Sequence, residues 1–136
     1  MTSGLGGASS GAPSLHHVAV GTRDVARLAD YYAQLLRVPE RKRHTDAAGL
    51  RSIWFDLSGT LLMIERSESS APREPVTGVG LGAFLLAFRA DADGRRAFEA
   101  RAQELGSEIE SRSEFTSYVR DPDGNRIAFS QYEVSP

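Results

Sequence analysis

The sequence predicts an α+β domain made of two β-α-β-β-β units, an assignment that depends on three observations. A short strand, β-branched in the first case, comes before each of two helices that an aspartate can cap. Alternating apolar segments, separated by glycine-containing turns, follow each helix. This order occurs twice, in residues 15–65 and again in residues 82–132, with a Ser-, Pro- and Gly-containing linker at 66–81.

The first unit begins with a predicted strand at 15–20, LHHVAV, followed by a helix near 24–37 that Asp24 can cap. Its apolar stripe recurs at helical spacing and consists of Val25, Leu28, Tyr32, Leu35 and Leu36. Strands are then predicted near 40–46, 50–57 and 60–65, with Ser58-Gly59 as the last turn. The basic run Arg41-Lys42-Arg43-His44 is interpreted as a solvated outer strand.

The second unit repeats this order. A strand is predicted at 82–90, GAFLLAFRA, and Asp91 or Asp93 can cap a helix near 93–105, with Gly106 just past its end. Strands near 107–112, 115–120 and 126–132 follow, the last two joined by the turn at 121–124.

Composition excludes several classes of function. The chain has 136 residues, a net charge of −2 and no cysteine, so disulfides, thiolate metal sites and cysteine nucleophiles are excluded. The charge does not favour nucleic acid or an anionic membrane as a partner. Residues 1–14 are rich in glycine and serine and lack a signal-peptide pattern, so we expect a disordered tail on a cytoplasmic protein.

Strand alternation separates a helix side from an open face. Superposing Gly59 on Gly124 matches Met63 with Ala128. The helix side then receives Leu62, Ile64, Ile127 and Phe129, and the opposite face receives Met63, Glu65, Ala128 and Ser130. The same alternation places Ser52, Trp54 and Asp56, together with Tyr118 and Arg126, on the open side. Aromatic side chains over an apolar floor are suited to a planar or hydrophobic small molecule.

The chain resembles the vicinal oxygen chelate superfamily, which includes glyoxalase I, extradiol dioxygenases and the fosfomycin- and bleomycin-resistance proteins. The resemblance is carried by LHHVAV, LLAFRAD and YVRDPDGNRIAF and covers residues 15–132. It implies curved mixed sheets around a cavity, the glyoxalase/bleomycin-resistance fold. It also implies a homodimer, because this family usually needs four units to close two cavities.

In metal-dependent members of this family, the first and last strands of each unit supply one ligand each. By this resemblance the four positions are His17, Met63, Leu85 and Ala128, of which only His17 suits a hard or borderline divalent ion. Glu65 shares the face of Met63, so His17 and Glu65 could hold at most a weakly bound divalent metal ion. Otherwise His17 is a pocket histidine and Glu65 a solvated carboxylate. The sequence indicates no cofactor other than this weakly bound metal ion.

The sequence is compatible with three functions. The first is binding of a small, largely apolar or aromatic molecule in a cavity with a degenerate metal site. Its ligand-binding residues would be Trp54, Asp56, Met63, Leu85, Tyr118, Arg126 and Ala128. The second is a divergent metal-dependent lyase, isomerase or dioxygenase of glyoxalase type with His17 and Glu65 as its catalytic residues. The third is a metal-free enzyme in which His17 acts as the base and Tyr118 or Arg126 polarises a carbonyl.

Overall fold

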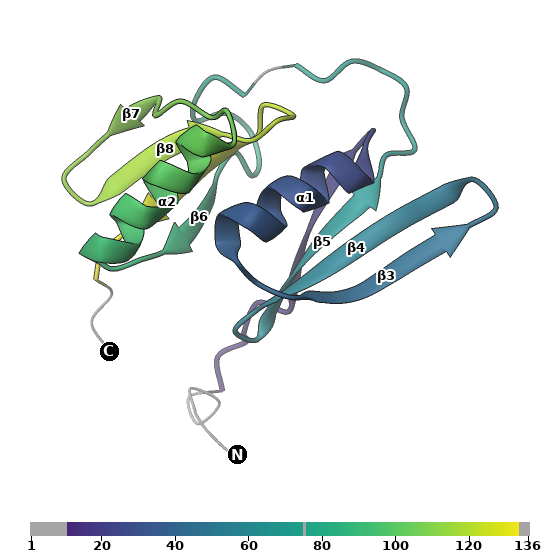
Figure 1. Ribbon diagram of the computed structural model, residues 1–136, viewed down its shortest axis with the longest axis horizontal. Helices are drawn as coiled ribbons and strands as arrows, with labels where there is room; N and C mark the ends of the chain where they lie inside the picture. Colours follow the sequence, from purple (N-terminus) through teal and green to yellow (C-terminus); the bar gives the residue numbers. More distant parts are fainter. Residues whose placement is uncertain (1–10, 75, 134–136) are drawn as a thin grey trace.

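The computed structural model describes residues 11–74 and 76–133 and confirms the α+β fold of two β-α-β-β-β units (Figure 1). The first unit consists of β2 (His17–Thr22), α1 (Val25–Leu36), β3 (Glu40–Asp46), β4 (Gly49–Leu57) and β5 (Thr60–Arg66). The second consists of β6 (Leu86–Arg89), α2 (Ala92–Glu104), β7 (Ser111–Arg112), β8 (Thr116–Arg120) and β9 (Arg126–Ser130).

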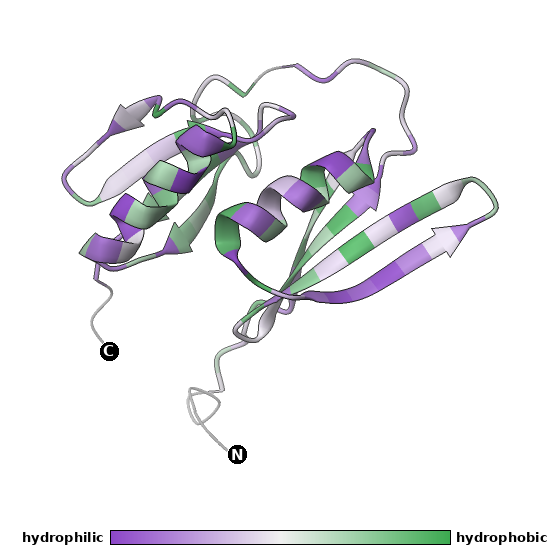
Figure 2. Cartoon of the chain, in the orientation of Figure 1, coloured by the Kyte–Doolittle hydropathy of each residue, from purple (hydrophilic) through white to green (hydrophobic). Residues whose placement is uncertain are grey.

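Each unit forms a four-stranded mixed sheet. The strand orders are β2-β5-β4-β3 and β6-β9-β8-β7, so the two sheets have the same topology. In each sheet the first strand pairs in parallel with the last, and the other pairs are antiparallel. Figure 2 shows the alternation of hydropathy along β4 and the mostly hydrophilic outer strand β3, as the sequence predicts.

The helices begin and end where local chemistry requires. The Asp24 side chain accepts a hydrogen bond from the Arg27 amide, and Asp91, not Asp93, caps α2 by accepting from the Gly94 amide at 2.7 Å. These carboxylates satisfy amides that have no partner within the helix. Gly106 follows α2 with φ of 95°, a conformation that favours glycine.

Three predicted strands of the second unit are shorter than expected, and the last of them, predicted at 126–132, ends at Ser130. β6 begins at Leu86, because that is the first residue to pair with β9. The strand predicted at 107–112 is reduced to Ser111–Arg112, because Ser107 closes α2 instead. The Ser107 amide donates to the Ala102 carbonyl, and its hydroxyl donates to the Arg120 carbonyl.

One hydrophobic core joins the two units. It contains buried residues of both units: Val25, Leu28, Ala29, Tyr31, Tyr32, Leu35, Ile53, Phe55, Leu62, Ile64, Ala102, Val119, Ile127 and Phe129. The expected helix-side positions Leu62, Ile64, Ile127 and Phe129 are therefore confirmed. The Tyr32 ring of α1 also lies 6.4 Å from the Phe88 ring of β6, centroid to centroid. Each sheet is covered on one side by its own helix, α1 against β4 and β5 and α2 against β8 and β9 (Figure 1), so the open face of each sheet is the side away from this core.

Polar contacts lock the units together at the same place. The Tyr32 hydroxyl donates to Asp121 at 2.6 Å, and the Tyr31 hydroxyl lies 2.7 Å from the Ser107 hydroxyl. All four side chains are buried. The Asp121-Pro122-Asp123-Gly124 turn is thus more than a chain reversal, because its first carboxylate anchors the second unit to helix α1.

Within the described part of the chain, no helix has the length and apolar character needed to cross a membrane.

Candidate functional site on two open sheet faces

The first open face is the side of the first sheet away from α1, and Trp54 lies near its middle. Trp54 on β4 pairs with Met63 on β5, which in turn pairs with Ala19 on β2. The indole nitrogen donates to the Glu65 carboxylate at 3.0 Å. Trp54, Met63 and Glu65 therefore lie together, and Glu65 fixes the indole by its polar edge.

Two residues of β3 complete the surroundings of Trp54. The His44 ring lies 4.7 Å from the indole, and the Lys42 ammonium lies 5.9 Å from the ring centroid. A ring nitrogen of His44 is 2.9 Å from the Ser52 hydroxyl. Sequence reasoning missed Lys42 and His44 because it treated the basic run as a solvated edge. Their alternation in the β3–β4 hairpin was the available signal.

Asp56 belongs to the same face but is committed to its own hairpin. One carboxylate oxygen accepts from the Gly59 amide at 3.1 Å, and the other accepts from Arg41 at 3.1 Å. These contacts give Asp56 a role in turn formation, which the sequence pattern did not indicate.

The second open face is the corresponding side of the second sheet, and Tyr118 takes the place of Trp54. Tyr118 on β8 pairs with Ala128 on β9, and Ala128 pairs with Ala87 on β6. The Arg126 guanidinium carbon lies 4.5 Å from the Tyr118 ring centroid, a cation–π contact. Ala128 is fully buried beside this pair. The structure thus brings Tyr118, Arg126 and Ala128 together as the sequence predicts.

Glu110 is a further charged residue on this side that sequence reasoning missed. Arg120 donates to it at 2.8 Å, and the Arg126 Nε atom lies 3.6 Å from its other oxygen. The hydrogen bond from Arg120, helped by the charges of Arg120 and Arg126, holds the pKa of the Glu110 carboxyl below its usual value. Glu110 is therefore an anion that balances the two arginines.

The donor set does not fit a divalent metal centre within one chain. His17 pairs with Leu61, whereas Glu65 pairs with Gly21. Their four-residue offset along β5 corresponds to roughly 13 Å at about 3.3 Å per residue, too far for two ligands of one ion. The His17 side chain is exposed, and its Nδ1 lies 2.9 Å from Nδ1 of His16. The structure therefore does not bring His17 and Glu65 together.

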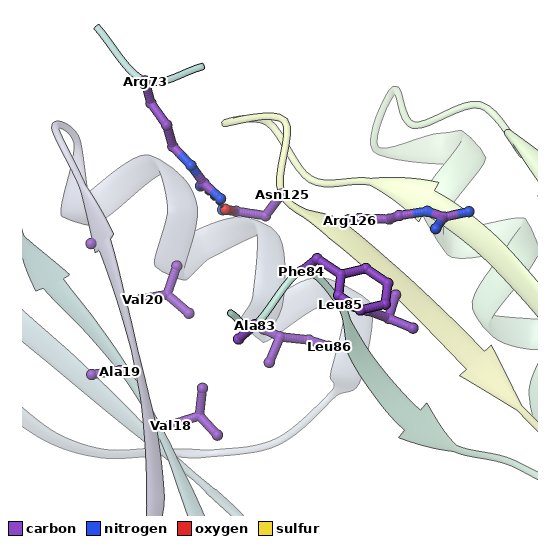
Figure 3. Close-up of a pocket in the computed structure, with 11 residues that line it drawn as sticks. Val18, Ala19, Val20, Arg73, Ala83, Phe84, Leu85, Leu86, Asn125 and Arg126 are labelled. Atoms are coloured by element: carbon purple, nitrogen blue, oxygen red, sulfur yellow. Dashed lines mark hydrogen bonds between the residues drawn. The ribbon is translucent and has the colours of Figure 1, made fainter. Parts of the chain in front are cut away.

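The other three positions that the family resemblance assigns to metal ligands do not fit a metal centre either. Met63, Leu85 and Ala128 offer no nitrogen or oxygen donor from their side chains, and a catalytic metal usually needs three protein ligands. Among the described residues, no group of three or more His, Asp or Glu side chains is placed to hold an ion. Leu85 precedes β6 and lies on the same side of that segment as Arg126 (Figure 3).

Two repeated units with the same sheet topology place the chain in the class of folds built from paired β-α-β-β-β modules. The model of the Glyoxalase/Bleomycin resistance protein/Dioxygenase superfamily matches residues 14–129, and the chain belongs to this family. This agrees with the resemblance that the sequence motifs carry.

Solved structures with the same fold support the architecture. The fosfomycin resistance protein FosX of Listeria monocytogenes, in complex with Mn(II) and 1S,2S-dihydroxypropylphosphonic acid, matches with a TM-score of 0.72 and 17% identity, over 89% of this chain and 94% of that one. A glyoxalase/dioxygenase from Nostoc punctiforme matches with a TM-score of 0.70 and 23% identity, over 95% and 96%. Lactoylglutathione lyase from Agrobacterium tumefaciens matches with a TM-score of 0.62 and 16% identity, over 86% and 92%. A sequence comparison with curated proteins finds no match.

Proposed function

We propose that this protein binds a small, largely apolar or aromatic molecule on its open faces, without a complete metal centre. The observation that carries this proposal is the equivalence of two pairs, Trp54 with Met63 and Tyr118 with Ala128. Each pair couples an aromatic ring to an apolar residue at a position where metal-dependent relatives would place a ligand. The site therefore offers ring stacking and apolar contact in place of metal coordination.

The chemistry around each ring favours a planar ligand. Lys42 lies over Trp54, and Arg126 lies over Tyr118, so a cationic side chain already restrains each ring. Glu65 restrains the indole further. Preorganised aromatic rings lose little conformational freedom when a ligand binds, which favours affinity.

A homodimer would turn these faces into a cavity. Because the two open faces of one chain point away from its shared core, each needs a second surface to enclose a ligand. We propose that the first open face of one copy meets the second open face of its partner, bringing Trp54 and Tyr118 of different copies to the same cavity.

The metal-dependent alternative draws its support from the family and from FosX, which is seen with Mn(II). It would need His17 and Glu65 as ligands or catalytic groups. The β2–β5 register separates these two side chains, which favours the binding function.

Metal and ligand titrations test the proposal together. Protein purified without chelator is analysed for metal and titrated with zinc, nickel and manganese by calorimetry, beside the double variant Leu85→His/Ala128→Glu. We expect weak metal binding by the wild type and at least tenfold tighter binding by the variant, because two donors are restored. Tight stoichiometric binding by the wild type would contradict the proposal.

The aromatic anion 1-anilinonaphthalene-8-sulfonate, whose naphthalene ring system is planar, serves as the probe for the aromatic faces. Its affinity should fall about tenfold in Trp54→Ala or Tyr118→Ala, since an aromatic contact is worth about 0.5–1.5 kcal/mol beyond its buried area. Tyr132→Ala is the matched control, because that ring is exposed, follows the end of β9 and packs against Phe115. Equal loss in all three variants would show that the probe binds elsewhere.

A further inference from the structure

A cleft of about 380 Å³ separates the edge strand β2 from the segment that leads into β6 (Figure 3). The strands β2 and β6 are edges of different sheets and do not pair with each other. The cleft shares Leu85 and Arg126 with the site proposed above, but neither Trp54 nor Tyr118 lines it. Val18 and Val20 border it and share the helix side of their sheet with Leu62 and Ile64, their partners on β5. Its volume lies at the small end of the range for small-molecule sites.

The walls of the cleft are apolar and incompletely covered. Val18 and Val20 are half-buried, although Leu62 and Ile64 on the same side of the neighbouring strand are fully buried. Across the cleft, Ala83, Phe84 and Leu86 also line it, and none of these three is fully buried. Among the described residues, no further helix or strand closes the hydrophobic core here.

Arg73 marks the polar end of the cleft, and buried groups fix its position. Asn125, which is 7% exposed, donates from its side-chain nitrogen to Asp121 at 2.7 Å. This bond leaves the Asn125 side-chain oxygen facing Arg73, which donates to it. That contact uses one of the five N–H groups of a guanidinium, so the others are available to a bidentate acceptor.

The charge of the cleft is one-sided. Of the described residues that line it, none carries a carboxylate, and the only charged side chains are Arg73 and Arg126. Figure 3 shows Arg126 extending away from Arg73, so a single guanidinium faces the apolar walls. An anionic group with a compact hydrocarbon body matches both features.

We propose that this cleft is a second binding site, specific for a small carboxylate with an apolar body. The carboxylate pairs with Arg73, and the hydrocarbon body packs between Val20 and Leu86. Such a ligand would bridge the two sheet edges. In this site Asn125, which follows the Asp-Pro-Asp-Gly turn, has the function of positioning the Arg73 guanidinium.

The test uses 3-phenylpropanoate as the probe and 3-phenylpropan-1-ol as its uncharged match, with the full-length protein. Methyl NMR should show carboxylate-dependent shifts at Val18, Val20 and Leu86 and at least tenfold weaker binding of the alcohol. Arg73→Gln should weaken binding of the carboxylate tenfold or more and leave binding of the alcohol unchanged. Arg73→Lys should recover part of the affinity, because it keeps the charge without the fork.

Arg23→Gln is the matched control, because Arg23 also contacts the linker, at Ser70, but does not line the cleft. It should leave the affinity unchanged. Three results would overturn the proposal: methyl shifts confined to Met63 and Ala128 on the open faces, equal binding of acid and alcohol, or methyl shifts that follow protein concentration and not the probe. The last would show that a second copy of the chain covers the cleft. Since Arg73→Gln leaves both open faces intact, failure here is distinguishable from failure of the proposed function.

Discussion

The two units share their order of elements but close their last hairpins differently. In the first unit, Ser58 and Gly59 form a two-residue turn with φ of 57° and 99°, and its side-chain contact comes from Asp56 of the same hairpin. In the second unit, the buried Asp121 binds amides of its own turn and also the Tyr32 hydroxyl of the first unit. The repeat therefore diverged at its turns, and of these two turns it is the second that binds the other unit.

The open faces of the two units also differ in the contacts that restrain their aromatic rings. In the first unit a hydrogen bond to Glu65 orients the aromatic ring, whereas in the second the Arg126 guanidinium covers it. Met63 remains partly exposed, while Ala128 is fully buried. The first face is thus the more open of the two, and its ring is the better reporter of a ligand.

Removing the anchor of the second turn should have the largest effect. Asp121→Ala leaves the Tyr32 hydroxyl and the Asn125 amides without their acceptor in a buried site. We expect the free energy of unfolding to fall by about 3 kcal/mol, since loss of one partner of a buried polar network costs the desolvation of the others. Urea denaturation measures this change.

Asp123→Ala, two residues away in the same turn, is the control for this change. Its carboxylate lies 3.9 Å from the exposed Arg27, and such a pair contributes about 0–1 kcal/mol. Similar losses for Asp121→Ala and Asp123→Ala would show that the turn as a whole, and not the link to α1, matters.

The Tyr32→Phe substitution tests the other end of the same link and should cost about 1 kcal/mol at neutral pH. Burial, and then the charge of Asp121, raise the pKa of the Tyr32 hydroxyl well above its usual value of 10.0. A raised pKa in the folded state means that the stabilisation is complete below about pH 10 and is lost as pH rises toward the folded-state pKa. Wild-type stability should therefore fall more steeply above pH 10 than that of Tyr32→Phe. Parallel pH curves would contradict this assignment.

The Glu65→Ala substitution should loosen Trp54 at a smaller cost, about 0.5 kcal/mol, because this hydrogen bond is only partly buried. Because Trp54 is the only tryptophan of the chain, its fluorescence anisotropy decay reports the indole alone. We expect faster indole motion in Glu65→Ala. The control Asp56→Asn, on the same strand as Trp54, should leave the indole motion unchanged. Unchanged motion in both would mean that His44 and Lys42 hold the ring.

Much of the fold followed from local patterns. The capped helices, the Ser58-Gly59 turn and the alternation that buries Ile64 and Phe129 depend on neighbours in sequence, and all are confirmed. The shortened strand at 111–112 was missed, because Ser107 closes α2 through contacts with Tyr31 and Arg120, far away in the chain.

The candidate site was predictable in part for the same physical reason. Strand parity assigned Trp54 and Tyr118 to their faces correctly, because parity is local. The separation of His17 from Glu65 depends on the parallel β2–β5 register, which no local pattern specifies. The pairing of Asn125 with Arg73 joins the last turn to the linker and had no signal in the sequence.

The smallest expected effect concerns acid stability, where the units again differ. Arg112 binds both oxygens of Glu99 at 3.0 and 2.8 Å, and these bonds, helped by Ser117, hold the pKa of the Glu99 carboxyl below its usual 4.5. In the first unit, Arg66 lowers the pKa of Asp46 at an exposed edge.

A carboxyl whose pKa is lower in the folded state stabilises the fold at pH values above its unfolded-state pKa. This stabilisation is lost as pH falls below about 4.5. Glu99→Gln should therefore be less stable than wild type at pH 7, by less than about 1 kcal/mol, and equal to it near pH 3. Asp46→Asn should show a smaller difference because solvent screens its pair. Urea denaturation at both pH values decides the matter, and a difference that stays constant between them would remove Glu99 from the acid response.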